Sequence, residues 1–277
     1  MYLAHFGLKQ APFGITPDTE FVYASNSHLE GLNLLLFALA SGEGFIKVVG
    51  EIGTGKTLLC RSFRAELGPE WKAAYLPNPQ MGPRDFFLAI ADDLGTPEGD
   101  VQAAYVIKRL NRRLLELAKQ GKKVVLCIDE AQTMPRLTLE SLRLLSNLET
   151  EKRKLLHIVL FGQPELDEML DAHSARQLKQ RIAFQHYLSH LGADEIGNYV
   201  SRRLVRAGYR GKSPFTRAAL KALHQSAGGT PRLVNIIAHK ALLAAFGEGS
   251  LQVEIHHVNM AAHDTAGAVK SRSWWPW

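Results

Sequence analysis

The chain has 277 residues and a formal net charge of +6, and 46% of its residues are hydrophobic and 22% are charged. This balance is typical of a folded globular protein of one or two domains and excludes disordered and collagen-like chains. The basic excess is modest, so it permits an acidic partner without requiring one. The longest apolar stretches, such as Leu34–Ala40, are far shorter than the ~20 residues of a transmembrane helix, and the first residues lack a secretory signal pattern. We therefore expect a cytoplasmic protein.

Five short apolar runs, each bounded by polar or turn residues, predict strands at Phe45–Val49, Ala73–Leu76, Val124–Ile128, Ile158–Phe161 and Phe184–Leu188. The first four runs lack strict alternation, which is typical of strands covered on both faces in a parallel sheet. Helical patterns lie between them, at Leu58–Leu67, Arg84–Leu94, Val101–Lys119 and Leu137–Glu149. Strands that alternate with helices predict an α/β fold with a parallel, doubly wound sheet.

After about Leu191 the pattern becomes entirely helical. Four helices, divided by Gly-, Pro- and Ser-containing stretches, are predicted at Asp194–Ala207, Phe215–Ser226, Arg232–Phe246 and Ile255–Thr265. The sequence therefore predicts an α/β domain over residues 1–191, a small helical domain over 192–266 and a Trp-rich tail over 267–277.

A phosphate-binding loop follows the first predicted strand. Gly50-Glu51-Ile52-Gly53-Thr54-Gly55-Lys56-Thr57 matches G-x-x-x-x-G-K-[ST] at every fixed position, and it opens a predicted helix, as the motif requires. Glycines let backbone N–H groups turn toward an anion, and the helix N-terminus adds its positive dipole end. Lys56 is expected to reach the β- and γ-phosphates of ATP, and the Thr57 hydroxyl to ligate Mg²⁺. A chance match in a glycine-rich turn is disfavoured by the strand and helix on either side.

Polar residues also follow two of the other predicted strands. Asp129 and Glu130 end the third strand, where Asp129 is expected to hold Mg²⁺ and Glu130 to orient or polarise the attacking water. The alternative is that these acids cap the next helix. Gln163 ends the fourth strand and is a candidate sensor of the γ-phosphate, with an ordinary loop-entry glutamine before a proline as the alternative.

Cysteines and histidines do not have the spacing of a metal site. Cys60 and Cys127 lie in apolar surroundings and are interpreted as small buried hydrophobic residues. His256, His257 and His263 do not share one face of their predicted helix, so we interpret them as surface or packing histidines.

The order of these motifs resembles the AAA+ ATPases: the phosphate loop, Asp129-Glu130, Phe161-Gly162-Gln163-Pro164-Glu165-Leu166 and Gly229-Thr230-Pro231-Arg232. More narrowly, the chain resembles the ExeA-type family of secretion and pilus-assembly ATPases, whose opening segment is similar to Phe6-Gly7-Leu8-Lys9-Gln10-Ala11-Pro12-Phe13, Pro17-Asp18 and Phe21-Val22-Tyr23. The resemblance extends from about Tyr2 to about Asp264, and within the family the Trp-rich end is most similar to the branch that serves mannose-sensitive haemagglutinin pili. It implies a P-loop AAA+ fold with a five-stranded parallel sheet and a helical lid, and an ATP-dependent homo-oligomer.

The resemblance also implies roles for single residues. Arg232 matches the sensor 2 arginine, which contacts the γ-phosphate from the lid helix. Arg181 stands where the family's trans-acting arginine finger is expected, with Arg176 as the nearby rival, and a solvated surface charge is the alternative for either. Three side chains of the N-terminal segment are expected to line the adenine pocket or, alternatively, to pack in a core: Phe13, Ile15 and Tyr23.

The favoured function is an ATPase that supports assembly of a type IV pilus or secretion machine at the inner membrane. Larger ExeA-type proteins continue into a transmembrane helix and a cell-wall-binding part, and this chain is expected to reach the envelope through a partner or its tail. Trp274, Trp275 and Trp277 suit a membrane interface or a partner pocket, with packing on their own domain as the alternative. A nucleic-acid ATPase of the transposition-regulator or initiator type is the competing function, based on the net charge and the basic segments Arg109–Arg113 and Arg202–Arg206.

Overall fold

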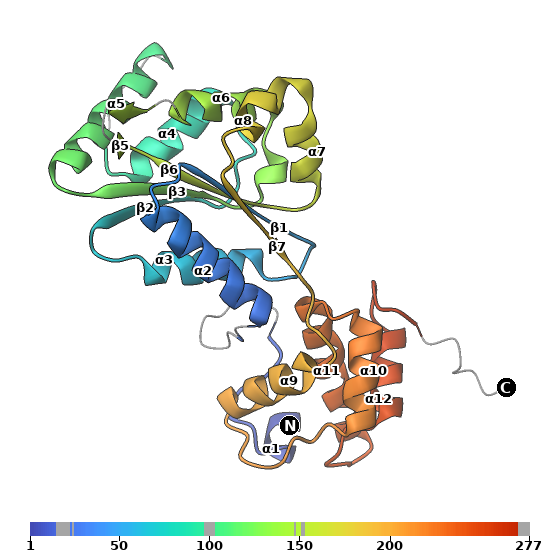
Figure 1. Ribbon diagram of the computed structural model, residues 1–277. Coiled ribbons are helices and arrows are strands. Elements are labelled where there is room, and N and C mark those ends of the chain that lie inside the picture. Colours follow the sequence, from blue (N-terminus) through green and yellow to red (C-terminus); the bar gives the residue numbers. More distant parts are fainter. Residues whose placement is uncertain (15–22, 24, 97–102, 147, 151–152, 271–277) are drawn as a thin grey trace. The chain divides into compact units, whose positions relative to one another are not determined.

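A computed structural model describes residues 1–14, 23, 25–96, 103–146, 148–150 and 153–270 (Figure 1). The chain forms two compact units. The α/β unit consists of Asn26–Ile52 and Lys56–Leu188, and the helical unit consists of Met1–Ser25, Gly53–Gly55 and Ser189–Trp277. Residues 271–277, which include the three tryptophans of the tail, lie outside the described part of the chain.

The α/β unit is built on a five-stranded parallel sheet, as the sequence predicts. Its strands are β1 (Phe45–Gly50), β2 (Trp71–Leu76), β3 (Lys123–Ile128), β6 (His157–Gly162) and β7 (Phe184–Leu188). They are arranged in the order β2-β3-β6-β1-β7, and all four pairings are parallel. All five predicted strands are therefore confirmed. A separate antiparallel hairpin, β4 (Glu149–Thr150) with β5 (Arg153–Lys154), was not predicted.

Helices cover both faces of this sheet (Figure 1). One face carries α2 (Asn26–Ala40) and α3 (Lys56–Glu66), and the other carries α4 (Pro83–Asp93), α5 (Ala103–Lys119), α6 (Arg136–Ser146), α7 (Glu165–Asp171) and α8 (Arg176–Lys179). Side chains of a strand alternate between the two faces, so Ile46 and Val48 join the core under α2 and α3, whereas Phe45 joins the core on the other face. Because helices cover both faces of the sheet, its strands do not need to alternate polar and apolar residues.

Four helices of the α/β unit begin and end within a few residues of their predicted bounds; α7 and α8 were not predicted, and neither was α2. Its C-terminal half, Leu32–Ala40, is almost continuously apolar, so it shows no apolar stripe with a 3.6-residue period. Only packing of Leu35, Ala38 and Leu39 against the sheet distinguishes this segment as a buried helix.

The helical unit contains α9 (Glu195–Arg206), α10 (Arg217–Ala227), α11 (Pro231–Gly247) and α12 (Ile255–His263), and all four were predicted. Local signals fix their ends. The Thr216 hydroxyl caps α10 by accepting from the Ala219 N–H at 3.2 Å, and Pro231 occupies the first turn of α11, where its missing N–H costs nothing. No helix in the described ranges is both long and apolar enough to cross a membrane.

The N-terminal segment belongs to the helical unit, which corrects the expected assignment of residues 1–25 to the α/β domain. Phe6, Leu8 and Phe13 are buried in the core formed with α9–α12. The short helix α1 (Tyr2–His5) begins this segment. Sequence periodicity reports local structure only, so it could not reveal that an N-terminal segment packs against helices about 200 residues away. The expected boundary at residue 191 lies close to Ser189, where the helical unit resumes.

Candidate nucleotide-binding site

Three predicted functional segments meet at one edge of the sheet. The phosphate loop follows β1, Asp129 follows β3, and Gln163 follows β6. These three strands are neighbours and run parallel, so the segments that follow them emerge at the same carboxyl edge. This edge is where open α/β sheets bind their ligands.

Lys56 begins α3, and its ammonium group lies under the phosphate loop. Its Nζ donates to the carbonyl oxygens of Gly50 at 2.7 Å and Glu51 at 3.1 Å, and the residue is only 5% exposed. Burial lowers the pKa of this lysine, while the nearby carboxylates of Glu130 and Asp129 favour its charged form. Its hydrogen-bonded partners are neutral carbonyls, so the positive charge remains available to an anion bound at the loop.

Thr57 and Asp129 form a pair of oxygen ligands beside the lysine. The Thr57 hydroxyl donates to Asp129 Oδ2 at 2.6 Å, and the Glu130 N–H donates to Asp129 Oδ1 at 3.0 Å. Burial raises the pKa of the Asp129 carboxyl, while these two donors oppose the rise. A hydroxyl and a carboxylate in contact are hard oxygen donors of the kind that Mg²⁺ prefers, so the residues fit that ion.

Tyr75 is a neighbour of Asp129 that the sequence did not single out. It comes from β2, and its hydroxyl donates to Asp129 Oδ2 at 3.4 Å. Burial, followed by the charge of Asp129, raises the pKa of Tyr75 to about 12. The phenol therefore stays protonated and can act only as a donor to this carboxylate near neutral pH.

Glu130 is held by two amide side chains. Its Oε2 accepts from Gln132 Nε2 at 2.6 Å and from Gln163 Nε2 at 3.1 Å, and the Gln163 N–H donates to Gln132 Oε1 at 3.0 Å. Gln132 was not predicted, although its place two residues after the glutamate, in the 3-10 turn η2 (Ala131–Thr133), is a signal that could have found it.

The backbone at Glu130 is left-handed, with φ 50° and ψ 39°. It is the one non-glycine residue with positive φ within the described ranges. Such a conformation costs on the order of 1–3 kcal/mol and persists where surrounding contacts enforce it. The Glu130 side chain makes no capping hydrogen bond to η2, so the helix-cap alternative does not describe this residue.

Comparisons with known proteins agree with this architecture. Residues 39–170 match the family described as AAA domain. The chain is similar to the ORC2 protein of Aeropyrum pernix (17% identity, 90% of this chain and 69% of that chain, TM-score 0.63). It is also similar to the RuvB Holliday junction branch migration motor of Thermotoga maritima (17% identity, 92% of this chain and 73% of that chain, TM-score 0.59). The chain has the P-loop AAA+ fold.

A curated relative is closer in sequence. The chain is 40% identical over 275 residues to General secretion pathway protein A of Aeromonas hydrophila. The match covers 99% of this chain and 50% of that protein, so the chain spans about half the length of the curated relative. The two solved structures, at 17% identity, establish the fold alone.

The positions of Arg176 and Arg181 in the chain place them away from the carboxyl edge of the sheet. Arg176 begins α8, and Arg181 stands three residues before β7. Phe184, the first residue of β7, pairs with Ile46 near the start of β1, whereas the phosphate loop follows the end of β1. Both arginines are exposed.

The remaining predicted residues belong to the helical unit. Arg232 is exposed in the first turn of α11, and its N–H donates to the Gly53 carbonyl at 3.4 Å within that unit. Phe13 is 3% exposed and packs edge-on against Phe215 with ring centroids 6.0 Å apart. Tyr23 packs edge-on against Tyr199 at 5.6 Å. Both aromatic rings thus contact the core of this unit, Ile15 lies outside the described residues, and adenine contact stays a prediction.

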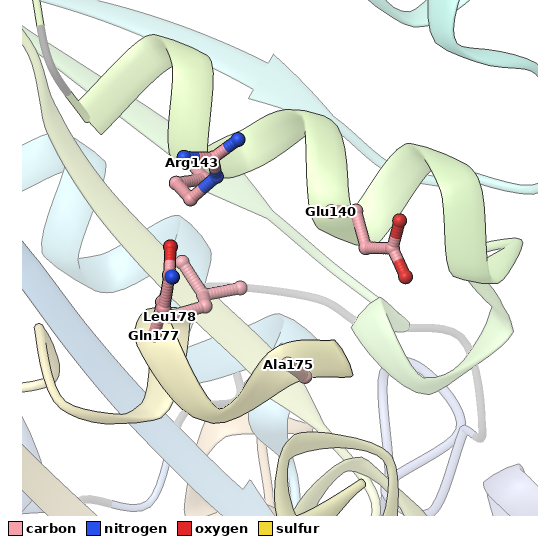
Figure 2. Close-up of a pocket in the computed structure, with 5 residues that line it drawn as sticks. All are labelled: Glu140, Arg143, Ala175, Gln177 and Leu178. Atoms are coloured by element: carbon pink, nitrogen blue, oxygen red, sulfur yellow. The ribbon is translucent and has the colours of Figure 1, made fainter. Parts of the chain in front are cut away.

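A separate pocket of about 320 Å³ lies between α6 and the η3–α8 segment, where η3 is His173–Ala175 (Figure 2). Its lining residues are Glu140, Arg143, Ala175, Gln177 and Leu178. None of these residues belongs to the phosphate loop or to the segment that contains Asp129 and Glu130. The pocket is therefore distinct from the nucleotide site.

Glu248, His256 and His257 form a cluster with ligand atoms within 4.8 Å of one another. The His257 Nδ1 accepts the Glu254 N–H at 2.9 Å, so the proton of the neutral ring resides on Nε2. That Nε2–H faces Glu248 Oε2 at 2.9 Å and donates to it. A nitrogen that carries a proton has no lone pair for a metal, so the cluster ties the start of α12 to the end of α11 instead.

Proposed function

We propose that this chain binds ATP with Mg²⁺, hydrolyses the bond between the β- and γ-phosphates, and belongs to the ExeA-type secretion and pilus-assembly ATPases. One observation carries the proposal: the phosphate-loop lysine, the Thr57–Asp129 oxygen pair and the amide-held Glu130 are assembled at one sheet edge. The 40% identity to General secretion pathway protein A supports the family and a role in secretion.

Each residue has a role that its chemistry suits. Backbone N–H groups of the loop from Gly50 to Gly55 hold the phosphates, with the Lys56 ammonium placed against the β- and γ-phosphates. Thr57 and Asp129 hold Mg²⁺, which when bound neutralises phosphate charge. Glu130 orients the attacking water and accepts its proton. These assignments divide binding from turnover, and the division can be tested.

Three further side chains complete the proposed site. Gln163 contacts the γ-phosphate and the water from the end of β6, and Arg232 contacts the γ-phosphate as sensor 2. Arg181, with Arg176 as the rival, acts on the nucleotide of a neighbouring subunit, because it stands at the amino end of β7 and not beside its own loop. A planar, permanently charged guanidinium suits charge stabilisation on a transferring phosphoryl group. Tyr23 and Phe13 contribute contacts near the adenine.

The test compares two substitutions at the same edge. Lys56→Ala should abolish ATP binding because it removes the counter-charge, whereas Glu130→Gln should keep ATP affinity and stop turnover. Affinity is measured with a fluorescent ATP analogue and turnover by phosphate release, and exposed Glu116→Gln is the matched control. Equal loss of affinity in both variants contradicts the division of roles.

The proposed partners are inner-membrane proteins of a type IV pilus or secretion machine, in the branch that serves mannose-sensitive haemagglutinin pili. The tail Trp274, Trp275 and Trp277 would make a peripheral contact, since indoles favour interfaces where one edge stays wet. Deleting residues 271–277 should leave the ATPase rate in solution unchanged and move the protein from the membrane fraction to the soluble fraction. A loss of turnover in the truncated protein would place the tail in the folded core instead.

A second candidate function, association with nucleic acid, is favoured by one charge pattern. Between Glu195 and Glu248 the sequence has nine Lys and Arg residues and no Asp or Glu. Four of these cations are exposed on and after the C-terminal half of α9: Arg202, Arg206, Arg210 and Lys212. Such an acid-free basic segment suits a phosphate backbone. Binding to a duplex that weakens steeply between 50 and 200 mM salt would support this function, and no binding at low salt would exclude it.

A further inference from the structure

We infer that Gln132 is a positioning residue that holds the Glu130 carboxylate in place for the attacking water. The inference deepens the proposed ATPase and rests on it for its catalytic meaning. It begins from a closed set of three hydrogen bonds that joins Glu130, Gln132 and Gln163.

Both amide groups donate to the same carboxylate oxygen. Gln132 Nε2 lies 2.6 Å and Gln163 Nε2 lies 3.1 Å from Glu130 Oε2. In the part of the chain that the structure describes, no protein donor to Glu130 Oε1 is recorded. Two hydrogen bonds from N–H groups to one charged oxygen fix the position of the carboxylate. Oε1 therefore keeps its capacity to accept a hydrogen bond from a water.

The orientation of the Gln132 amide is fixed by its second hydrogen bond. Its Oε1 accepts the backbone N–H of Gln163 at 3.0 Å, which forces its Nε2 toward the Glu130 carboxylate. The reversed amide would place an NH₂ group against the Gln163 N–H and a carbonyl oxygen against the carboxylate, and both contacts are repulsive. Gln132 thus acts as a rigid link between the ends of β3 and β6.

Gln132 and Gln163 differ in how their contacts to Glu130 are anchored. Gln163 holds Glu130 through its side chain, which leaves the carboxylate if it turns toward a phosphate. Gln132 is anchored to the backbone N–H of Gln163, and that anchor does not depend on the Gln163 side chain. Gln132 can therefore retain Glu130 while Gln163 contacts nucleotide. A misplacement of about 1 Å in a reacting group can cost on the order of 100-fold in rate, so this retention matters for turnover.

Turnover and affinity are measured for two substitutions of this glutamine. Gln132→Met removes both of its hydrogen bonds, whereas Gln132→Glu keeps the acceptor for Gln163 and removes the donor to Glu130. Both should lower the single-turnover rate about 10- to 100-fold and change the dissociation constant of a fluorescent ATP analogue by less than about twofold. Gln120→Met, the same chemical change at an exposed position of the α/β unit, should change neither.

A double substitution distinguishes a positioning role of Gln132 from general structural damage. In Glu130→Gln, the added Gln132→Met should cause no further loss of the slow residual turnover that remains over long incubation, because residues that act as a unit are not additive. A full additional loss there, an equal loss of ATP affinity, or near-normal turnover in Gln132→Met would each overturn the inference.

A second measurement works without nucleotide or turnover. Gln132→Glu should lower the melting temperature of the nucleotide-free protein in the wild-type background and clearly less in the Glu130→Ala background, since only the former brings two carboxylates together. Equal shifts in the two backgrounds would refute the contact. If the wild-type protein hydrolyses no ATP, the proposed function fails on that result, while this cycle still decides whether Gln132 holds Glu130.

Discussion

Each unit of the protein buries a polar network, and the two networks differ in what they leave unsatisfied. In the helical unit, Arg203 donates to the Pro12 carbonyl at 2.7 Å, the Gly14 carbonyl at 3.0 Å and the Tyr199 hydroxyl at 3.3 Å. Tyr199 in turn donates to Asn235 at 2.8 Å. In the α/β unit, Asp129, Glu130 and Lys56 also have hydrogen-bond partners. Their charged groups can nevertheless make further contacts, to a cation, a water and a phosphate.

Burial of charge therefore does not by itself identify a functional site. The guanidinium of Arg203 has a planar set of donors that matches main-chain carbonyls, and it uses them to fix the N-terminal segment on α9. Asp129 is buried as well, at 2% exposed against 8% for Arg203, yet its neighbour Glu130 is a second carboxylate with a left-handed backbone. The candidate site therefore differs from the network around Arg203 in two ways: its charged groups can still bind a ligand, and its backbone is strained.

The largest expected effect tests whether the network of the α/β unit is incomplete within one subunit. Arg181→Ala should keep ATP affinity and lose turnover by about 10³- to 10⁵-fold, the range of an arginine finger. Mixing Arg181→Ala with Lys56→Ala subunits should restore part of the phosphate release, because each supplies what the other lacks. Normal assembly without any rescue would leave Arg181 as a surface charge, and the same mixture with Arg176→Ala then tests the rival.

The second-largest effect is expected for stability, in the network around Arg203 of the helical unit. Arg203→Met should lower the free energy of unfolding by about 2–3 kcal/mol, because it leaves the buried Pro12 carbonyl and the Tyr199 hydroxyl without this donor. Urea denaturation measures the change, and exposed Arg202→Met on the same helix is the matched control. Lys56→Met should destabilise the protein less, because the lost hydrogen bonds to the Gly50 and Glu51 carbonyls are offset by removal of a charge whose burial is costly. If Arg203→Met unfolds with wild-type stability, the clamp on the N-terminal segment is unimportant.

A smaller effect is expected at Asp129, where stability and function should move in opposite directions. Burial raises the pKa of this carboxyl in the folded protein, so the folded state binds its proton more tightly than the unfolded state does. Stability from this group is then lost as pH rises through the folded pKa. Asp129→Asn should therefore raise the free energy of unfolding at neutral pH by about 0.5–2 kcal/mol and abolish the Mg²⁺ dependence of ATP binding. Destabilisation at neutral pH would contradict the cost of burying this charge.

The smallest effect concerns His157, a buried polar residue of the α/β unit without a proposed role in catalysis. Its Nδ1–H donates to the Glu43 carbonyl at 2.6 Å, and burial lowers its pKa below the usual value of 6.5. Below pH 6.5 the unfolded state binds the proton more readily, so stability falls as pH falls, by at most about 1.4 kcal/mol per pH unit. His157→Asn, which can keep the donor without titrating, should show a shallower decline between pH 7 and 5. An identical pH profile would exclude His157 as a contributor.

Most of the fold could be predicted because its signals are local. Apolar runs without alternation located four strands, a fifth and less apolar run located β7, and the phosphate loop located the boundary between β1 and α3 to within two residues. The misses have specific causes. The segment of α2 lacks a stripe, the two-residue strands of the β4–β5 hairpin carry no pattern, and the N-terminal segment owes its place to contacts about 200 residues away.

The sequence by itself determined the candidate residues of the site: Lys56, Thr57, Asp129 and Glu130 follow from motif spacing, because adjacent parallel strands bring their carboxyl ends to one edge. Tertiary structure alone decided how those residues are held. Gln132 and Tyr75 reach the carboxylates from a 3-10 turn and from β2, and Lys47, in the middle of an otherwise apolar strand, is buried by its ion pair with Asp167 of α7. Spacing along the chain fixes which strand end a residue occupies, but the partner of a buried polar group is chosen by distance in space, which the local pattern does not contain.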